Sequence, residues 1–508
     1  MNVLLVYPEF PDTFWSLKHA LRFVRKKAFS PPLGLLTVAA MLPGEWRKRL
    51  VDVNVTPLCQ RDLAWADYAF VSGMAVQGQS ARQVIARCKA AGVKVVAGGP
   101  LFSSESERFA EVDHFILNEA ELTLPPFLAD LGAGRAGRVY ATSELADLRR
   151  TPVPSWELLA PKEYLCMSVQ FSRGCPYDCE FCNVTSLFGH RPRTKTAQQI
   201  VAELDGLWTG GWRGSVFFVD DNLIGNRKAA REELLPALIG WQRGKGGISF
   251  LTQATINLAD DETLVRRMVE AGFDTVFVGI ETPEAAGLRE CQKRHNQGRD
   301  LVSDVKRLQR AGLQVQAGFI VGFDSDTPSV FQRQIDFIQQ SGIVTAMVGL
   351  LQAFGGTRLY ERLRREGRLL GEPTGDNADG TTNIVPAMGI GVLRAGYRRI
   401  LQAIYSPRQY YQRLTTFLRE YRAPKMGMRL DVTRIVAFFR SLYELGVVGK
   451  ERVYYWKLLL WTAVCRPRLL PLAVSLAICG HHYRTICELH GGGKAGGECR
   501  RRGGGARI

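Results

Sequence analysis

Three cysteines lie close together in a short loop, and their type and spacing suit a metal centre. The segment 171–186 reads FSRGCPYDCEFCNVTS and places Cys175, Cys179 and Cys182 in a C-x3-C-x2-C pattern. Soft thiolates at this spacing can hold one iron–sulfur centre. Because three ligands leave one iron of a 4Fe-4S cluster open to a small molecule, the pattern indicates chemistry and not only structure.

A zinc site is the alternative interpretation of the same loop. His190 would then be the fourth ligand of a closed Cys3His tetrahedron, and the chain would be a zinc-stabilised binding protein. Zinc modules usually pair two C-x2-C units, whereas this loop follows directly on a predicted strand, where active sites of barrel folds lie. Spacing and context together favour the cluster.

The strand before the cysteines opens an alternating series that predicts a partial (β/α)6 barrel over 161–370. Amphipathic stretches such as 261–271, 300–311 and 329–340 predict its helices. The predicted strands are 165–172, 215–219, 248–254, 275–280, 313–321 and 344–353. Chemistry is expected at the carboxyl ends of these strands.

Residues 1–131 predict a doubly wound parallel sheet with a Rossmann-like α/β fold. Short apolar runs at 3–7, 50–53, 68–72, 93–97 and 115–117 alternate with helical stretches such as 80–91. Ligands of such sheets bind at the carboxyl ends of the strands. The candidate cofactor contacts there are Ser72, Gly73, Gly98, Gly99 and Glu119.

A linker rich in Gly, Arg and Ser is expected over 132–160, a helical C-terminal domain over 371–490, and a low-complexity, disordered tail over 491–508. The whole chain has 508 residues and 46% hydrophobic residues, which excludes a small disulfide scaffold and a disordered chain. The start of the sequence is interpreted as a first strand and not as a signal peptide, so the eleven cysteines are expected to be reduced and the protein cytoplasmic.

The cysteine loop resembles the signature of the radical S-adenosylmethionine (radical SAM) enzymes. The resemblance implies that Cys175, Cys179 and Cys182 hold a 4Fe-4S cluster whose fourth iron is chelated by S-adenosylmethionine, and that reduction cleaves the sulfonium to a 5'-deoxyadenosyl radical. An electron donor of the flavodoxin or ferredoxin type, or a reductase, is then required. The remaining residues that it places around S-adenosylmethionine are Phe181, Asp220, Asp221, Glu281, Gly318 and Gly322.

The resemblance assigns a part to each of these residues. Phe181 would lie close to the adenine, and the Asp220-Asp221 turn would hold the methionyl amino group. Glu281 would accept hydrogen bonds from the ribose hydroxyls. Gly318 and Gly322 would let the backbone approach the adenine.

The first domain resembles the cobalamin-binding domain that precedes the barrel in one branch of these enzymes. The segment 31–35, PPLGL, and the turn 98–100, GGP, carry this likeness. The D-x-H-x-x-G motif of other cobalamin proteins is absent, and neither His19 nor His114 stands in such a context. Cobalamin is therefore expected to bind without a protein imidazole; the alternative is a degenerate domain that has lost its ligand.

The expected activity is methylation of an unactivated carbon of a small-molecule, hydrophobic or lipid substrate. A radical rearrangement or cyclisation without methyl transfer is the alternative within the enzymes. No residue is assigned as a catalytic acid or base on the substrate side. Cys166 and Cys291 are interpreted as buried hydrophobic residues.

Positive charge is concentrated at the C-terminal end. Residues 391–508 hold 22 Lys and Arg against 6 Asp and Glu, a net +16 of the +17 of the whole chain. A solvated face, an anionic membrane surface or nucleic acid would each account for it. Nucleic acid is less favoured, because the family's tRNA-modifying members carry extra cluster cysteines near the N-terminus and only Cys59 and Cys88 occur before residue 150.

The segment 452–479 contains two apolar helical runs with a break near Arg466 and Arg468. Each run is too short for a membrane span, so an integral membrane protein is not expected. The pair is predicted either to pack on the barrel or to lie on the inner face of a membrane as a peripheral contact.

Overall fold

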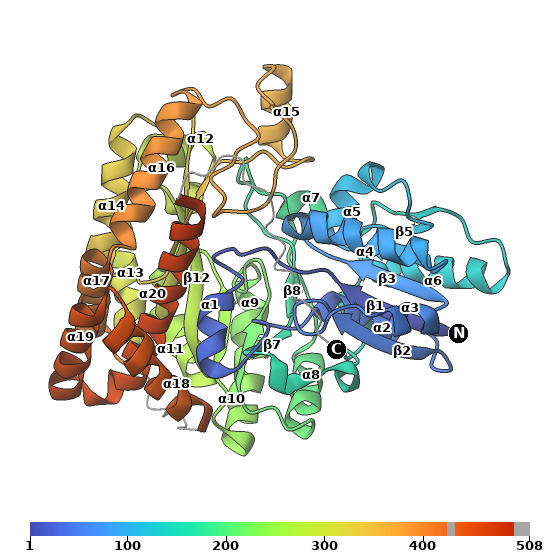
Figure 1. Ribbon diagram of the computed structural model, residues 1–508, viewed down its shortest axis with the longest axis horizontal. Coiled ribbons are helices and arrows are strands. Elements are labelled where there is room, and N and C mark those ends of the chain that lie inside the picture. The colour runs from blue at the N-terminus through green and yellow to red at the C-terminus, as the bar shows by residue number, and fades with distance from the viewer. Residues whose placement is uncertain (424–431, 492–508) are drawn as a thin grey trace, which may run out of the picture.

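The computed structural model describes residues 1–423 and 432–491 and contains two parallel six-stranded sheets side by side (Figure 1). The expected tail at 491–508 lies outside the described residues, apart from Gly491 at the end of the last helix. The strand orders are β2-β1-β3-β4-β5-β6 and β14-β13-β12-β11-β10-β7, which confirms the predicted α/β class.

The first sheet is covered by helices on both faces. Its strands are β1 (Asn2–Tyr7), β2 (Arg47–Asp52), β3 (Tyr68–Ser72), β4 (Lys94–Gly98), β5 (His114–Ile116) and β6 (Val139–Tyr140). Its helices are α2 (Leu33–Met41), α3 (Gln60–Trp65), α4 (Gly78–Ala90), α5 (Pro100–Glu105) and α6 (Ala120–Gly132). Alternate residues of β1 point to opposite faces of the sheet and enter two different cores. Val3 packs with residues of α2 and α6, and Leu4 packs with residues of α3 and α4. The short strand β6 pairs with β5 inside the segment that the sequence assigned to a linker.

The second sheet is open and curved, with helices along its outer face (Figure 1). Its strands are β7 (Cys166–Val169), β10 (Ser215–Phe218), β11 (Phe250–Gln253), β12 (Phe273–Glu281), β13 (Gln314–Val321) and β14 (Ala346–Leu350). Its helices are α8 (Ala197–Thr209), α9 (Arg227–Ala229), α10 (Leu235–Lys245), α11 (Glu262–Ala271), α12 (Ala285–Glu290), α13 (Leu301–Ala311) and α14 (Ser329–Ser341). A small antiparallel pair, β8 (Ser172–Arg173) and β9 (Arg193–Thr194), flanks the cysteine loop and α7 (Val184–Phe188).

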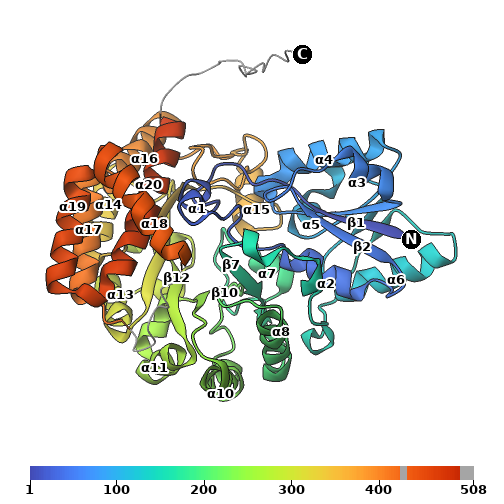
Figure 2. The same ribbon diagram turned by 60° about the horizontal axis from the view of Figure 1, so that its bottom comes forward.

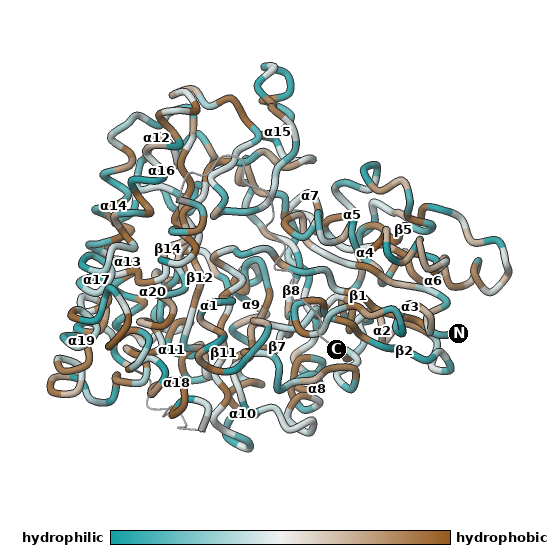
Figure 3. Tube along the Cα trace, viewed as in Figure 1, coloured by the Kyte–Doolittle hydropathy of each residue, from teal (hydrophilic) through white to brown (hydrophobic). Residues whose placement is uncertain are grey.

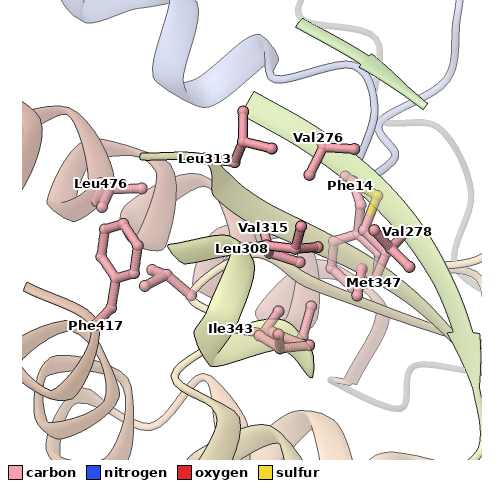
Figure 4. Packing of buried hydrophobic residues seen from close by; sticks show 14 of the residues in the cluster. Phe14, Val276, Val278, Leu308, Leu313, Val315, Ile343, Met347, Phe417 and Leu476 are labelled. Carbon is pink, nitrogen blue, oxygen red and sulfur yellow. The ribbon is translucent and has the colours of Figure 1, made fainter. Parts of the chain in front are cut away.

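The C-terminal part is helical, as expected, and shares one core with the second sheet. Its helices are α15 (Arg358–Arg365), α16 (Ile390–Ile404), α17 (Pro407–Glu420), α18 (Val432–Tyr443), α19 (Arg452–Cys465) and α20 (Leu470–Gly491). Phe417 of α17 and Leu476 of α20 are buried in the same cluster as Leu308 and Val315 (Figure 4). The helices therefore cover the barrel. In the described part of the chain, no helix has the length and apolar content needed to cross a bilayer.

The N-terminal segment leaves the first sheet after β1 and crosses to the barrel before α2. Its short helix α1 (Lys18–Leu21) lies beside α20 in both ribbon views (Figures 1 and 2). Phe14 is buried against Tyr405 and Tyr483, and His482 Nε2 lies 3.2 Å from the carbonyl oxygen of Thr13. This segment connects all three parts of the molecule, and no periodic pattern in the sequence predicted it.

Candidate functional site

The cysteine loop lies between β8 and α7, at the carboxyl end of β7. Its start is held by a hydrogen bond from the Cys175 amide to the Gly189 carbonyl, 3.2 Å, and its middle by one from the Glu180 amide to the Cys291 carbonyl, 3.0 Å. Gly174 has φ 94°, and a Cβ there would lie 2.9 Å from the Gly189 oxygen. Only glycine therefore fits where the chain turns into the loop.

The three thiols are half-buried, and burial raises the pKa of each. For Cys182 the pKa rises to about 12. A thiol with so high a pKa stays protonated at neutral pH unless a metal ion binds the sulfur and displaces the proton. Soft metal ions bind thiolates in this way. The donor set thus fits an iron–sulfur centre.

The zinc interpretation gains no support from the geometry. His190 is exposed, and no three His, Cys, Asp or Glu side chains gather around a single-ion position within residues 1–423 and 432–491. In a 4Fe-4S cluster each cysteine binds a different iron, so its ligands need not converge on one point.

Asp220 has a different part from the one the sequence suggested. Its side chain is fully buried and accepts hydrogen bonds from the Phe171 amide, 3.0 Å, and from the Ser172 amide and hydroxyl, both 2.5 Å. Asp220 therefore fixes the strand that leads into the cysteine loop, and both of its carboxylate oxygens already accept hydrogen bonds within the protein. Asp221, half-buried beside it, has a pKa raised to about 7 by burial and by the charge of Asp220.

Glu281 ends β12 at an irregular point of the sheet. The register between β12 and β13 shifts between Gly279 and Glu281, and Glu281 has φ 64°, a left-handed conformation that costs free energy for a residue other than glycine. Its Oε1 accepts a hydrogen bond from Lys293 Nζ, 2.5 Å, and both side chains are 9% exposed. No sequence motif predicted this buried pair, because Lys293 belongs to none.

Lys293 also faces the cysteine loop. Its ammonium group lies 5.9 Å from the centre of the Phe181 ring. Although burial disfavours its charged form, Glu281 and the Cys179 thiol raise the pKa of Lys293 above its usual range. A lasting positive charge here offsets the negative charge that three thiolates bring.

A cavity of about 220 Å³ opens beside these residues, at the carboxyl ends of β12, β13 and β14. Phe181, Glu281 and Gly318 line it, so three of the predicted residues meet there. Gly322 does not line it; its φ is 114°, its amide donates to Asp326 Oδ2 at 2.9 Å, and it packs near Leu393. The other lining residues are Trp15, Phe277, Phe319, Ile320, Met347, Gly349, Leu350, Leu351, Gln352, Phe354 and Asn377.

Trp15 is a cavity residue that sequence reasoning missed. It comes from the N-terminal segment, and its ring packs against Phe277 with centroids 5.0 Å apart. Most of the lining on this side is aromatic or aliphatic. The cavity therefore suits an apolar molecule next to the polar pair of Glu281 and Lys293.

The predicted loops of the first sheet only partly form a common site. Ser72, Gly73, Gly98 and Gly99 meet at the ends of β3 and β4, where Gly99 has φ 89° and lies against the Ser72 side chain. These turns lie at the carboxyl ends of neighbouring parallel strands, the edge at which such sheets bind ligands. The His114 imidazole lies elsewhere, with Nδ1 2.7 Å from the Gly137 carbonyl.

Glu119 is not available to a cofactor, which corrects the prediction. It is 2% exposed and its oxygens lie 3.0 Å from Arg173 Nη1 and 2.8 Å from Arg193 Nη1. Glu121 adds a second contact to Arg173, 2.9 Å. These ion pairs tie the first sheet to the β8–β9 pair that carries the cysteine loop.

A loop with three thiols at the end of the first barrel strand, next to an apolar cavity, is typical of enzymes that use an iron–sulfur cluster on a small molecule. Residues 169–338 match the model of the radical SAM superfamily, and residues 357–494 match a domain of unknown function, DUF4070. The chain is 38% identical to an uncharacterized methyltransferase of Synechocystis, over 96% of this chain and 92% of that protein. It is 34% identical to the hopanoid C-2 methylase of Rhodopseudomonas palustris, over 90% and 88%.

Solved structures share the fold. The cobalamin-dependent S-adenosylmethionine radical enzyme OxsB superposes with a TM-score of 0.61 at 13% identity, covering 96% of this chain and 79% of OxsB. The radical S-adenosylmethionine methyltransferase TsrM of Kitasatospora setae gives 0.54 at 17% identity, covering 72% and 76%. The chain belongs to the radical SAM enzymes and uses a 4Fe-4S cluster and S-adenosylmethionine.

Proposed function

We propose that this protein methylates an unactivated carbon of a hydrophobic, polycyclic substrate, with cobalamin bound by the first sheet. The observation that carries the proposal is the cavity between the cysteine loop and Trp15, whose lining is mostly apolar, with polar side chains at Glu281, Gln352 and Asn377. Its lining supports a substrate without charged groups. The names of the two relatives, a methyltransferase and a hopanoid C-2 methylase, support methyl transfer to a polycyclic lipid.

In this proposal Cys175, Cys179 and Cys182 hold the cluster, and the turns around Gly73 and Gly99 face the cobalamin. When bound, these groups supply the reducing electron, the hydrogen abstraction and the methyl carrier. The protein itself binds and orients the substrate and the cofactors, and it excludes water. Lys293 balances the thiolate charge, while Glu281 keeps an oxygen at the cavity wall for a hydrogen-bond donor of S-adenosylmethionine.

The apolar wall of the cavity has a positioning role. Trp15, Phe277 and Met347 offer a substrate only dispersion contacts and a dry surface. Such a wall keeps dissolved hydrogen-atom donors, such as thiols, away from a carbon radical. An electron donor of the flavodoxin or ferredoxin type completes the proposed system.

The test is a methyl-transfer assay on protein purified without oxygen from cells supplied with cobalamin. Iron and cobalt are measured per chain, and S-adenosylmethionine with a deuterated methyl group is incubated with a hopanoid and a reductant. A deuterated methyl on a ring carbon, found by mass spectrometry, is the expected result. If S-adenosylmethionine is cleaved but the product is rearranged and unlabelled, the activity is a radical rearrangement and not methyl transfer. Iron without cobalt would overturn the role of cobalamin.

A further inference from the structure

The helix α19 lies at the outer edge of the molecule and carries apolar side chains on its outer face as well as on its inner one, with Lys457 among the outer ones (Figures 1 and 3). Its inner face, with Tyr455 and Leu458, is buried in the core shared with the barrel. On its outer face Val453 is 56%, Leu460 65% and Val464 82% exposed. A surface helix normally places polar side chains on its outer face, so these three exposed apolar side chains call for a partner.

The turn before α19 extends this apolar face. The π-helix η10 (Glu444–Val448) continues α18, and Tyr443, Val447 and Val448 are 64%, 58% and 64% exposed. Trp456 Nε1 donates to the Gly446 carbonyl at 2.9 Å and so joins η10 to α19. The residues Tyr443, Val447, Val448, Val453, Trp456 and Leu460 are called the α18–α19 apolar surface below. Such a gathering of exposed apolar side chains marks an interaction surface.

Basic side chains accompany this surface. Lys450, Arg452 and Lys457 are exposed within the same short stretch. Of the acidic residues there, Glu444 is exposed, whereas Glu451 is buried and paired with Arg484. Lys450 makes an ion pair with Glu488 that is almost fully solvated, with side chains 86% and 66% exposed, and such a pair holds the ammonium group only weakly.

We propose that the α18–α19 apolar surface docks on an anionic lipid bilayer. Valine and tryptophan side chains enter the boundary between headgroups and acyl chains, while lysine and arginine side chains meet the anionic headgroups. A second copy of the chain fits this surface less well, because a symmetric contact would bring Lys450, Arg452 and Lys457 of both copies together. The inference rests on the proposed function, in which a hydrophobic substrate resides in the bilayer.

The experiment measures co-sedimentation of the full-length protein with vesicles of phosphatidylcholine, with and without phosphatidylglycerol. The variant Val448→Asp/Val453→Asp places two carboxylates on the surface. The matched control is Val139→Asp/Leu370→Asp, at positions that are 56% and 61% exposed elsewhere on the molecule. Wild type and control are expected to bind vesicles with phosphatidylglycerol, and the surface variant to bind about tenfold less.

Each outcome decides the inference. Equal binding by the surface variant, or no binding by the wild type, would overturn it. A lipid-free wild type that sediments as a dimer while the surface variant is a monomer would assign the surface to a second copy instead. Iron content and cleavage of S-adenosylmethionine, measured without vesicles, are expected to be the same in all three proteins, so failed docking is distinguishable from failure of the radical chemistry.

Discussion

At the residue scale, five ionisable side chains at the cysteine loop depend on one another. Three thiols with raised pKa values face the ammonium group of Lys293, which is itself paired with Glu281. Removing any member changes the charge of a largely buried site. The consequences differ for a ligand and for a residue that balances charge.

Cys182→Ala removes one proposed covalent ligand of the cluster. The variant is therefore expected to lose its bound iron and to cleave S-adenosylmethionine at least about a hundredfold more slowly. Cys166→Ala is the matched control, since Cys166 is also buried but its Sγ only contacts the Phe29 carbonyl, 3.4 Å. Iron determination and detection of 5'-deoxyadenosine after anaerobic reconstitution check both variants. Full iron in Cys182→Ala would remove this cysteine from the ligand set.

Lys293→Met leaves the Glu281 carboxylate buried without its partner. Breaking a buried pair in this way costs about 3–5 kcal/mol, so the free energy of unfolding should fall by that order. The double variant Lys293→Met/Glu281→Gln removes the orphaned charge and is expected to recover most of the loss. Urea unfolding of the metal-free wild type, single variant and double variant measures these free energies. If the double variant is no more stable than the single one, the orphaned Glu281 charge is not the cause of the loss.

At the element scale, α19 and α20 are joined by a carboxylate at the start of α19. Glu451 is 4% exposed and contacts Arg484, and His481 Nδ1 lies 3.7 Å away. Burial alone would raise the pKa of Glu451, but the nearby His481 and the charge of Arg484 lower it to about 2. The carboxylate therefore stabilises the helix pair in its charged form.

The pH dependence of this contact follows from the sign of the shift. A pKa of about 2 in the folded protein lies below the ordinary value, so the stabilisation is full above about pH 4.3 and is lost as the pH falls toward 2. Glu451→Gln should lower the free energy of unfolding by about 2 kcal/mol at pH 7, with a smaller difference at pH 3. Denaturant unfolding at several pH values measures it.

Glu488→Gln is the control for this series. Glu488 makes an exposed pair with Lys450, with side chains 66% and 86% exposed. Its replacement should change the free energy of unfolding by about 0.5 kcal/mol or less at every pH. A Glu451→Gln effect independent of pH would contradict an electrostatic origin.

At the scale of the whole molecule, the N-terminal segment connects the first sheet, the barrel and the C-terminal helices. Phe14→Ala should lower the free energy of unfolding by about 3–5 kcal/mol, because Phe14 is 1% exposed among Tyr405 and Tyr483. Trp15→Ala, at a side chain that is 40% exposed, should change stability little and raise the KM for the substrate. Thermal unfolding and initial rates separate the two; equal stability losses would contradict the distinction.

The sequence predicted the strands closely and the long-range side-chain contacts hardly at all. Tyr68–Ser72 agrees with β3 to the residue, because β-branched and aromatic runs between turns carry a local pattern. The sequence predicted the correct strand end for Glu119 but a cofactor as its partner. Its partners are Arg173 and Arg193, which come close to it only in the folded chain. Lys293 and Trp15 have no local pattern, and only the packing brings them to the cavity.

The path of the N-terminal segment has a consequence for synthesis on the ribosome. Thr13 and Phe14 emerge long before their partner His482. The first sheet can form early, but Trp15 can cover the cavity only after α20 has left the exit tunnel. A chain that stops before α20 therefore leaves the barrel mouth open, so the enzyme can confine a radical only once α20 has been translated.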